Sequence, residues 1–287
     1  TDGGVYKTSN PAGPNFNWQS LNATISTITF YNGLAIDPTD VQRALGGTQD
    51  NGTNRYTGSL TWTSNAWCGD GGYSAFDFTN PQIDYSACGA NQGIAKTLDG
   101  GVNYAAADAG IITSDRQAWV PPLVMDPSNA QVLYWGTYRV YQTTDGAASW
   151  VPISGDLAGG SGTVTTVAVA PTDSNTVYVG ASDGSVQISA NAGSASGAIW
   201  TNVTGTLPQR SIAQIAVDPR DAASAVVVNS GFDAGHVFQT SDRGSSWADI
   251  SGNLPNSPVN TLVIDPGMLN TIYVGTDVGV FQTTNNG

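Results

Sequence analysis

Two aspartates are the strongest candidates for chemistry in this sequence. The chain of 287 residues contains 22 Asp and no Glu, so any pair of carboxyl groups must come from aspartate. Asp50 lies in GGTQDNGT (46–53) and Asp70 lies in GDGGYSAFDFTNP (69–81). Hydrolysis of a glycosidic bond requires two carboxyl groups, one acting as general acid and the other as base or nucleophile. We therefore take Asp50 and Asp70 as candidate catalytic residues for cleavage of a sugar chain.

Aromatic and charged residues in the predicted loops form the candidate ligand-binding set. Aromatic faces stack on the C–H faces of sugar rings, and neighbouring polar groups hydrogen-bond to sugar hydroxyls. The predicted ligand-binding residues are Tyr31, Trp67, Tyr73, Arg116, Trp119, Arg139, Asp183, Asp233 and Asp277. Two other interpretations stay open. An Asp in such a loop can serve only to shape the turn, and Trp67 and Trp119 can be buried within the fold.

Metal and cofactor chemistry find little support. His236 is the only histidine, so a zinc-binding histidine cluster cannot form. The stretch QDNGTN (49–54) offers oxygen ligands but too few carboxylates for a convincing calcium site. We find no nucleophile elbow, phosphate-binding loop or Cys/His pair. We expect no metal site and no cofactor.

The net charge and the cysteine content limit the classes of binding partner and the cellular location that we expect. The net charge of −13 argues against nucleic acid, which needs a basic surface. The nine Lys and Arg residues are scattered, and no run of 18 apolar residues occurs, so we expect no membrane insertion. Cys68 and Cys88 are either two buried thiols or one disulfide. We favour the disulfide, which implies an oxidising compartment and hence a secreted or cell-surface protein.

The elements that position these residues follow a repeat of about 46 residues. An apolar strand ending in Pro recurs, with prolines at 38, 81, 127, 171, 219 and 266 that are spaced by 43 to 48 residues. A second apolar strand, a third strand, a polar turn and a short fourth strand follow each time. Four such strands make one antiparallel sheet, and radial repetition buries both of its faces. We predict one all-β domain over 1–287, a β-propeller of six or seven four-stranded blades with almost no helix.

The polar octet TSDRGSSW (240–247) is predicted to be the hairpin turn between the third and fourth strands of a blade. Its Thr and Asp can hydrogen-bond the turn backbone, its Gly can adopt a positive φ, and its Trp can pack between blades. Imperfect copies are TLDGGVNY (97–104) and TTDGAASW (143–150), and TTNNG (283–287) begins another. The residues given this structural role are Asp99, Asp145, Trp150, Asp242, Gly244 and Trp247.

The octet resembles the Asp-box, or bacterial neuraminidase repeat, written Ser/Thr-x-Asp-x-Gly-x-x-Trp. All four defining positions match in 240–247, whereas Tyr104 replaces the Trp of one copy and Ala147 the Gly of another. The resemblance covers nearly the whole chain and implies a propeller like those of sialidases, xyloglucan-cleaving hydrolases, sortilin-type receptors and assembly factors. Stretches 46–53 and 69–81 resemble secreted bacterial sortilin-like and glycosidase-like propellers. Sialidases need a Tyr–Glu pair that this Glu-free chain lacks, but xyloglucan-cleaving hydrolases use two aspartates.

The sequence leaves open how the ring closes. TDGGVYKTSN (1–10) and TDVGVFQTTN (276–285) occupy the same phase six periods apart, so the third strand occurs in two terminal copies. Six blades would leave one copy surplus, and seven would lack about three strands. Either the chain is an excerpt of a longer protein, or the surplus strand pairs with another chain.

We expect a secreted or cell-surface binding module whose partner is a carbohydrate or a protein. One alternative is an endo-acting glycoside hydrolase that uses two Asp. Another is an extracellular structural protein that forms filaments by exchange of its terminal strands. The three hypotheses share the propeller and differ in what its loops and terminal strands do.

Overall fold

The computed structural model describes residues 5–9, 17–22, 28–65, 67–89, 92–233 and 235–286. Regular structure in these ranges is almost entirely β-strand, because the chain is rich in Thr, Val and Tyr and poor in good helix formers. A short 3-10 helix, η2 (Ala192–Gly197), occupies the insertion that precedes Trp200. The all-β prediction is confirmed.

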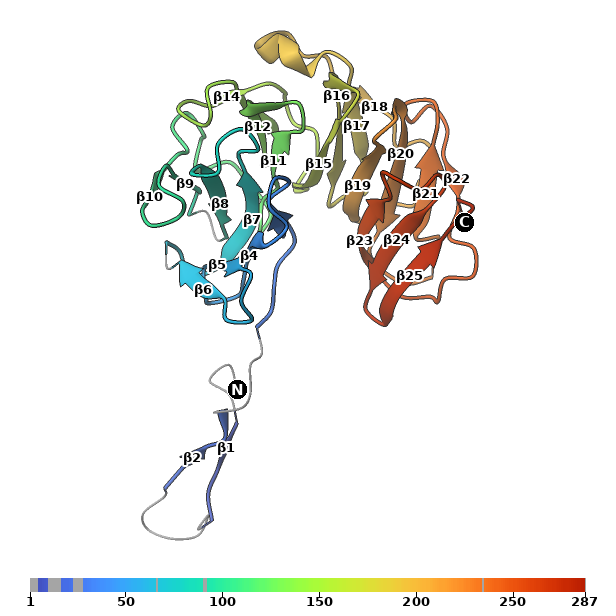
Figure 1. The fold of residues 1–287 in the computed structure, drawn as a ribbon. Helices are drawn as coiled ribbons and strands as arrows, with labels where there is room; N and C mark the ends of the chain where they lie inside the picture. Colours follow the sequence, from blue (N-terminus) through green and yellow to red (C-terminus); the bar gives the residue numbers. More distant parts are fainter. Residues whose placement is uncertain are drawn as a thin grey trace.

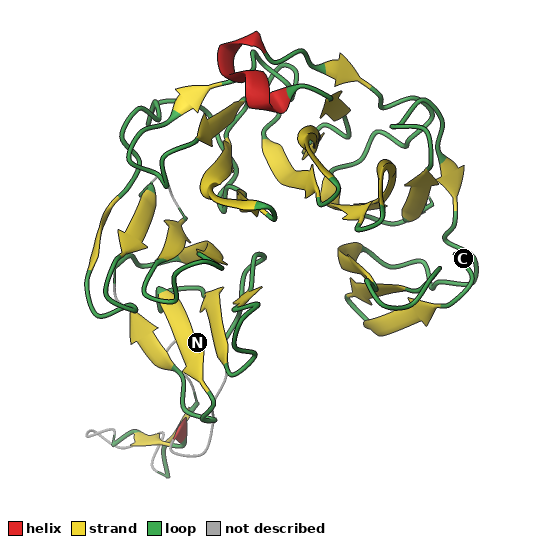
Figure 2. Ribbon diagram, turned by 45° about the horizontal axis from the view of Figure 1, so that its top comes forward, coloured by secondary structure: helices red, strands yellow, loops and turns green. Residues whose placement is uncertain are grey.

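Six antiparallel sheets form the blades of a propeller, and the strands of each blade pair in chain order (Figures 1 and 2). Blade 1 consists of β3 (Ala35–Ile36), β4 (Arg43–Gly47), β5 (Thr53–Thr57) and β6 (Thr63–Asn65). Blade 2 consists of β7 (Gly71–Phe76), β8 (Asp84–Cys88), β9 (Ile94–Thr97) and β10 (Tyr104–Ala106). Blade 3 consists of β11 (Leu123–Asp126), β12 (Asn129–Gly136), β13 (Val140–Thr143) and β14 (Val151–Pro152). Blade 4 consists of β15 (Val164–Ala170), β16 (Asp173–Ala181), β17 (Val186–Ser189) and β18 (Thr201–Asn202). Blade 5 consists of β19 (Ile212–Asp218), β20 (Asp221–Asn229), β21 (Val237–Thr240) and β22 (Ala248–Asp249). Blade 6 consists of β23 (Val259–Ile264), β24 (Ile272–Thr276) and β25 (Gly279–Thr283).

The core lies between neighbouring blades. The first strands β7, β11, β15, β19 and β23 pack side by side around the axis. Tyr178 and Ile188 of blade 4 pack against Ile215 and Val227 of blade 5, and similar clusters lie between other neighbours. Each of blades 2 to 5 is therefore covered on both faces, which explains why its second strand contains a continuous apolar run instead of an alternating pattern.

The octet 240–247 is a hairpin turn between β21 and β22. Thr240 donates its hydroxyl to Asp242 at 2.7 Å and accepts the backbone N–H of Gly244 at 2.9 Å. Gly244 has φ 79, the left-handed conformation that glycine adopts without strain. The indole of Trp247 crosses to blade 4 and donates to the carbonyl of Val203 at 2.7 Å. The turn therefore links adjacent blades as well as adjacent strands.

The ring stays open between blade 6 and blade 1, which lie at the two ends of an arc (Figure 2). Blade 6 has three strands among the described residues, and its outermost strand is β25. The N-terminal segment forms a separate hairpin of β1 (Tyr6–Lys7) and β2 (Gln19–Ser20), which projects beyond blade 1 (Figure 1). Of the two blade numbers that the sequence allowed, the structure has six.

Candidate functional site

One end of the propeller collects most of the candidate residues. In an antiparallel blade the second strand ends at the edge where the first strand begins. The loops that join second to third strands therefore lie beside the segments that enter each blade. Asp50 follows β4, Asp70 precedes β7 and Trp119 precedes β11, so all three belong to this end.

The segments that carry Asp50 and Asp70 are in direct contact. The backbone N–H of Asp50 donates to Oδ1 of Asp70 at 2.8 Å. A parallel bridge between Gly52 and Asp70 joins the same two segments. Asp50 has φ 58, a left-handed conformation that places it at the tip of a tight turn. The side chain of Asp50 is exposed, and that of Asp70 is half-buried.

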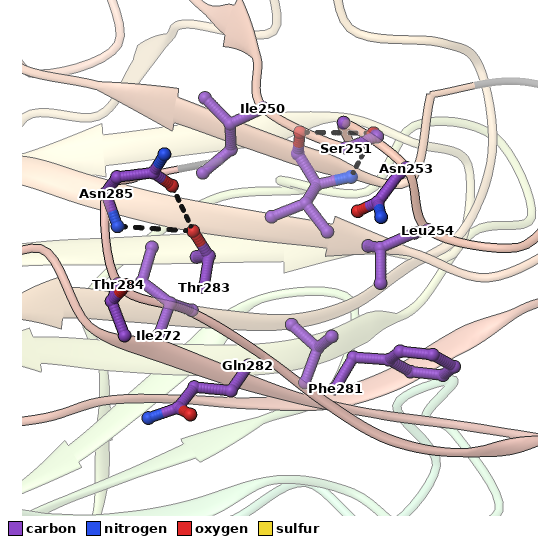
Figure 3. Close-up of a pocket in the computed structure, with 13 residues that line it drawn as sticks. Ile250, Ser251, Asn253, Leu254, Ile272, Phe281, Gln282, Thr283, Thr284 and Asn285 are labelled. Carbon is purple, nitrogen blue, oxygen red and sulfur yellow. Dashed lines mark hydrogen bonds between the residues drawn. The ribbon is translucent and has the colours of Figure 1, made fainter.

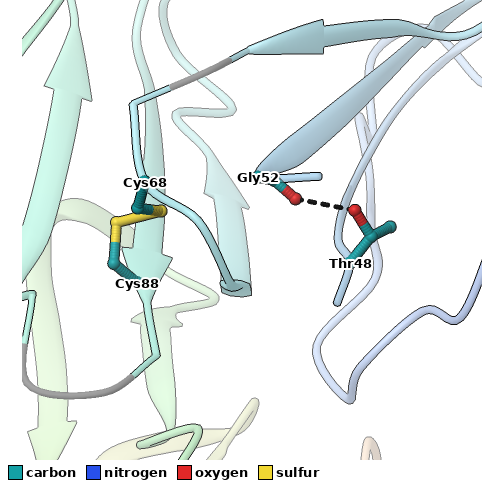
Figure 4. The surroundings of a disulfide bond; sticks show 4 residues. All are labelled: Thr48, Gly52, Cys68 and Cys88. Carbon is teal, nitrogen blue, oxygen red and sulfur yellow. Dashed lines mark hydrogen bonds between the residues drawn. A yellow bond between two sulfur atoms is a disulfide. The ribbon is translucent and has the colours of Figure 1, made fainter. Parts of the chain in front are cut away.

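A disulfide holds the segment that carries Asp70. Cys68 and Cys88 are bonded, with their Cα atoms 6.0 Å apart, and this links the chain before β7 to the end of β8 (Figure 4). The N–H of Gly52 donates to the carbonyl of Gly69 at 2.7 Å, and the Thr48 hydroxyl donates to the carbonyl of Gly52 at 2.9 Å. Asp70 is thus fixed by covalent and backbone contacts on both sides.

The two candidate tryptophans are exposed and not buried between blades. Trp119 is 59% exposed and Trp67 is 40% exposed. Gly89 separates Trp119 from the acidic pair: a Cβ at Gly89 would lie 3.2 Å from the Cβ of Asp70 and 3.6 Å from Nε1 of Trp119. The indole of Trp119 and the side chain of Asp70 therefore lie on either side of Gly89, at the same end of the propeller.

A cavity of about 310 Å³ opens on the propeller axis, next to the segment that carries Trp119. Segments that enter five successive blades line it, with residues Phe30, Tyr31, Asn32, Tyr73, Ala118, Val120, Thr165, Ser211, Ile212 and Ala213. Burial raises the pKa of Tyr73 to about 12, although a hydrogen bond with Asn32 opposes the shift. Tyr73 therefore stays neutral near pH 7 and presents an aromatic face and a hydroxyl. The cavity has the size and mixed lining of a small-ligand pocket.

The two candidate arginines are held in ion pairs within the chain. Arg139 contacts both carboxylate oxygens of Asp115, at 2.8 and 2.9 Å. Burial alone would raise the pKa of Asp115, but hydrogen bonds from Arg139 and Tyr141 hold it below its usual value. Arg116 pairs with Asp156 at 2.6 Å. Both guanidinium groups lie over the ring of Tyr138, 4.5 and 4.7 Å from its centroid, so this cluster holds the loops together.

The three remaining candidate aspartates are exposed and accept hydrogen bonds, Asp183 within its own loop and the other two from separate segments. Asp183 accepts from the N–H and hydroxyl of Ser185, Asp233 from the amide of Asn256, and Asp277 from the amide of Asn260. The contacts of Asp183 fit the turn-shaping interpretation, whereas those of Asp233 and Asp277 join their loops to the chain that enters blade 6. Asp2 and Asn91 share their repeat phase but lie outside the described residues. The structure therefore brings Asp50, Asp70, Tyr31, Tyr73 and Trp119 to one region.

Sequence reasoning did not single out several residues of this region. Asn32, Thr165 and Ile212 line the cavity because they enter blades 1, 4 and 5 next to the axis. Tyr138 completes the arginine cluster. The repeat phase that places a residue just before or at the start of a first strand would have identified the cavity residues.

In the described ranges, no three His, Cys, Asp or Glu side chains come together in a way that could hold a metal ion. Across the same part of the chain, no helix has the length and apolar character to cross a bilayer.

Comparison with solved structures shows the same fold in proteins of distant sequence. No family model and no curated protein matches this chain. The GH74 enzyme of Niastella koreensis has a TM-score of 0.67 and 18% identity over 89% of this chain and 45% of that one. The GH74 xyloglucanase of Xanthomonas campestris has a TM-score of 0.69 and 15% identity, covering 88% and 45%. YCF48 bound to D1 peptide has a TM-score of 0.57 and 13% identity, covering 94% and 83%.

These likenesses establish the propeller and no more. The chain spans less than half the length of either GH74 enzyme. Two of these proteins are GH74 enzymes and the third, YCF48, has a bound peptide, so the shared fold does not select one activity.

Proposed function

We propose that the protein is a carbohydrate-binding propeller of the Asp-box type that binds a glycan at the end of the ring where Asp50, Asp70 and Trp119 meet. The observation that carries this proposal is the exposed indole of Trp119 beside the acidic pair, next to an axial cavity with Tyr31 and Tyr73 in its wall. Sugars combine apolar C–H faces with hydroxyl groups, and this region offers a partner for each.

The surroundings of the site support a rigid receptor. The disulfide and the backbone contacts around Gly52 fix Asp70, and the ion pairs of Arg116 and Arg139 fix the loops next to Trp119. A preformed site loses little conformational entropy on binding. The disulfide and the low content of charged residues also support a secreted or cell-surface location, which stays part of this proposal.

A glycan array compared between the wild-type protein and Trp119→Ala tests the sugar. We expect the wild type to bind one class of glycan and Trp119→Ala to lose binding by about tenfold or more, because aromatic anchors carry much of such binding energy. Ile199→Ala is the matched control, since Ile199 is 69% exposed on a loop between third and fourth strands, at the opposite end. Absence of binding to any glycan, or equal loss in both variants, would contradict the proposal. Binding only to a peptide array would replace the sugar with a protein partner.

A second candidate is an endo-acting glycoside hydrolase with Asp50 and Asp70 as its two carboxyl groups. The specific observation in its favour is that their two segments meet, through the 2.8 Å hydrogen bond from the backbone N–H of Asp50 to the Asp70 carboxylate. The GH74 neighbours, one of which is a xyloglucanase, suggest xyloglucan as the first substrate to try.

Release of reducing ends from xyloglucan distinguishes this candidate from simple binding. We expect activity, if the pair is catalytic, to fall by several orders of magnitude in Asp50→Asn and Asp70→Asn, because each removes a proton-transfer or nucleophilic group without changing its shape. Glycan binding that persists in both variants without any release would assign the site to binding alone.

A further inference from the structure

Arg210 differs from most arginines of the chain because it has no acidic partner. Five arginines each pair with an aspartate at 2.6 to 2.8 Å, namely Arg43, Arg55, Arg116, Arg139 and Arg220. Within the described ranges, Arg210 and Arg243 form no such pair. Arg243 is exposed on an octet turn, whereas Arg210 is half-buried. A half-buried guanidinium has lost part of its hydration, so an anion from outside the chain would stabilise it.

Two glycines allow neighbouring loops to pack closely against Arg210. A Cβ at Gly184, in the loop between β16 and β17 of blade 4, would lie 2.7 Å from the backbone nitrogen of Arg210. A Cβ at Gly231, in the loop between β20 and β21 of blade 5, would lie 2.6 Å from its Nη1. The backbone N–H of Arg210 also donates to the carbonyl of Pro208 at 2.7 Å. The guanidinium therefore has a defined position at the end of the propeller that carries the proposed glycan site.

Arg210 immediately precedes the blade 5 part of the axial cavity. Residues 211–213 follow it and line the cavity. Ala118 and Val120, which flank Trp119, line the same cavity from blade 3. Trp119 and Arg210 therefore border one cavity from two blades, the first with an aromatic ring and the second with a positive charge.

The groove between blades 5 and 6 offers a contrast in charge. It has a volume of about 440 Å³, and its apolar wall includes Ile250, Ile272 and Phe281 (Figure 3). Its polar groups are hydroxyls and amides, such as the Thr283 hydroxyl that donates to Asn285 at 2.7 Å. None of the described side chains that line it is charged. An anionic ligand therefore finds a cationic partner beside the axial cavity and not in this groove.

We propose that the glycan bound at the axial cavity is acidic and that Arg210 recognises a carboxylate on one of its sugars. This inference rests on the proposed function, because it names the class of sugar for the same site. A guanidinium presents two parallel N–H donors that match the two oxygens of a carboxylate. A uronic acid combines such a carboxylate with the C–H faces and hydroxyls that suit Trp119. Arg210 is thus a specificity-determining residue that distinguishes an acidic sugar from its neutral counterpart.

The aspartates at this end restrict how an acidic glycan can lie. Asp70 and Trp119 lie on either side of Gly89, and Asp183 is exposed in the blade 4 loop that packs against Arg210. A ligand carboxylate next to either aspartate is repelled, whereas one next to Arg210 is attracted. We therefore expect the acidic sugar to bind on the blade 5 side of the cavity and a neighbouring sugar to stack on Trp119.

Affinities for matched acidic and neutral glycans test this inference on the full chain. The probes are oligomers of galacturonate, glucuronate, mannuronate and guluronate, the methyl ester of each, neutral xyloglucan oligosaccharides and a sulfated oligosaccharide. We expect the wild type to bind at least one oligouronate about tenfold or more tightly than its methyl ester, because esterification removes the charge-assisted hydrogen bonds. Arg210→Gln should bind the acid and the ester alike. Arg210→Lys should show an intermediate preference, since it keeps the charge without the paired donors.

Arg243→Gln is the matched control. Arg243 also lacks an ion pair in the part of the chain that the structure describes, but its octet turn lies at the opposite end of the propeller. This variant should keep the preference of the wild type. Gly231→Ala places a Cβ 2.6 Å from Nη1 of Arg210, so it should weaken binding of the oligouronate while the arginine itself is retained.

The outcomes separate this inference from the proposed function. Equal wild-type affinity for every oligouronate and its ester, or an unchanged preference in Arg210→Gln, would overturn the inference. Tighter binding of the sulfated oligosaccharide than of any oligouronate would also overturn it. Binding of a neutral glycan that is lost in Trp119→Ala but kept in Arg210→Gln would overturn the inference and leave the proposed function standing. Absence of binding to any glycan would contradict the proposed function itself.

Discussion

Single residues decide how closely adjacent blades approach, and Gly244 is the clearest case. Its φ of 79 is left-handed, and a Cβ there would lie 2.7 Å from Cγ2 of Val203 in blade 4. We expect Gly244→Ala to lower the free energy of unfolding by about 1–3 kcal/mol, through strain and displacement of the residue that accepts the Trp247 indole. Thermal unfolding measures this loss.

The control for that prediction is Gly155→Ala. A Cβ at Gly155 meets no atom within 4 Å, and the residue has no positive φ, so its effect should stay within about 0.5 kcal/mol. Equal stability of Gly244→Ala and wild type would show that the turn does not set the spacing of the blades. Ala147, with φ 68 at the same octet position, shows that blade 3 accommodates a methyl group where its neighbours leave room.

At the scale of elements, the carboxylates of the octet turns make the stability of the blades depend on pH. Hydrogen bonds from Asn103 lower the pKa of Asp99 to about 2, and hydrogen bonds from Ser149 and Thr143 lower that of Asp145 to about 2. Because these values lie below those of the unfolded chain, the unfolded state binds more protons between about pH 4 and pH 2. The stabilisation is present above about pH 4 and is lost as pH falls through the folded-state values.

Thermal unfolding between pH 5 and pH 2 tests this coupling. The melting temperature should fall most steeply below about pH 4, and Asp145→Asn should show a shallower fall, because an amide does not titrate in this range. Asn191 already occupies the corresponding place in blade 4, accepting from the Ser189 hydroxyl at 3.2 Å, so the substitution has a precedent in the chain. Identical pH profiles of the two proteins would contradict a stabilising role for this carboxylate.

The elements were predictable from the sequence where local chemistry sets them. The blade period and the turn at 240–247 follow from nearby residues: Thr240, Asp242 and Gly244 contact one another within five positions. The partners of Arg116 and Arg139 were not predictable, because Asp156 and Asp115 lie 40 and 24 residues away and meet them only after the blades pack.

At the scale of the whole molecule, the site depends on how the blades are arranged about the axis. Five blades contribute to the axial cavity, and no repeat by itself shows that Tyr31, Tyr73 and Ile212 face the same space. The contact of Asp50 with Asp70 likewise depends on the packing of blade 1 against blade 2. The repeat predicted six or seven blades, and only the assembled ring showed six, the last with three strands among the described residues.

The most direct test of the central claim is a titration of the protein with a glycan identified on the array, followed by the indole N–H signals of its eight tryptophans in ¹⁵N NMR. The exposed Trp119 should shift first and most. Trp150, Trp200 and Trp247, which donate to backbone carbonyls between blades, should stay in place. A saturable shift of the Trp119 signal that leaves these three unchanged is the predicted result. Binding that leaves Trp119 unchanged would contradict the proposed site.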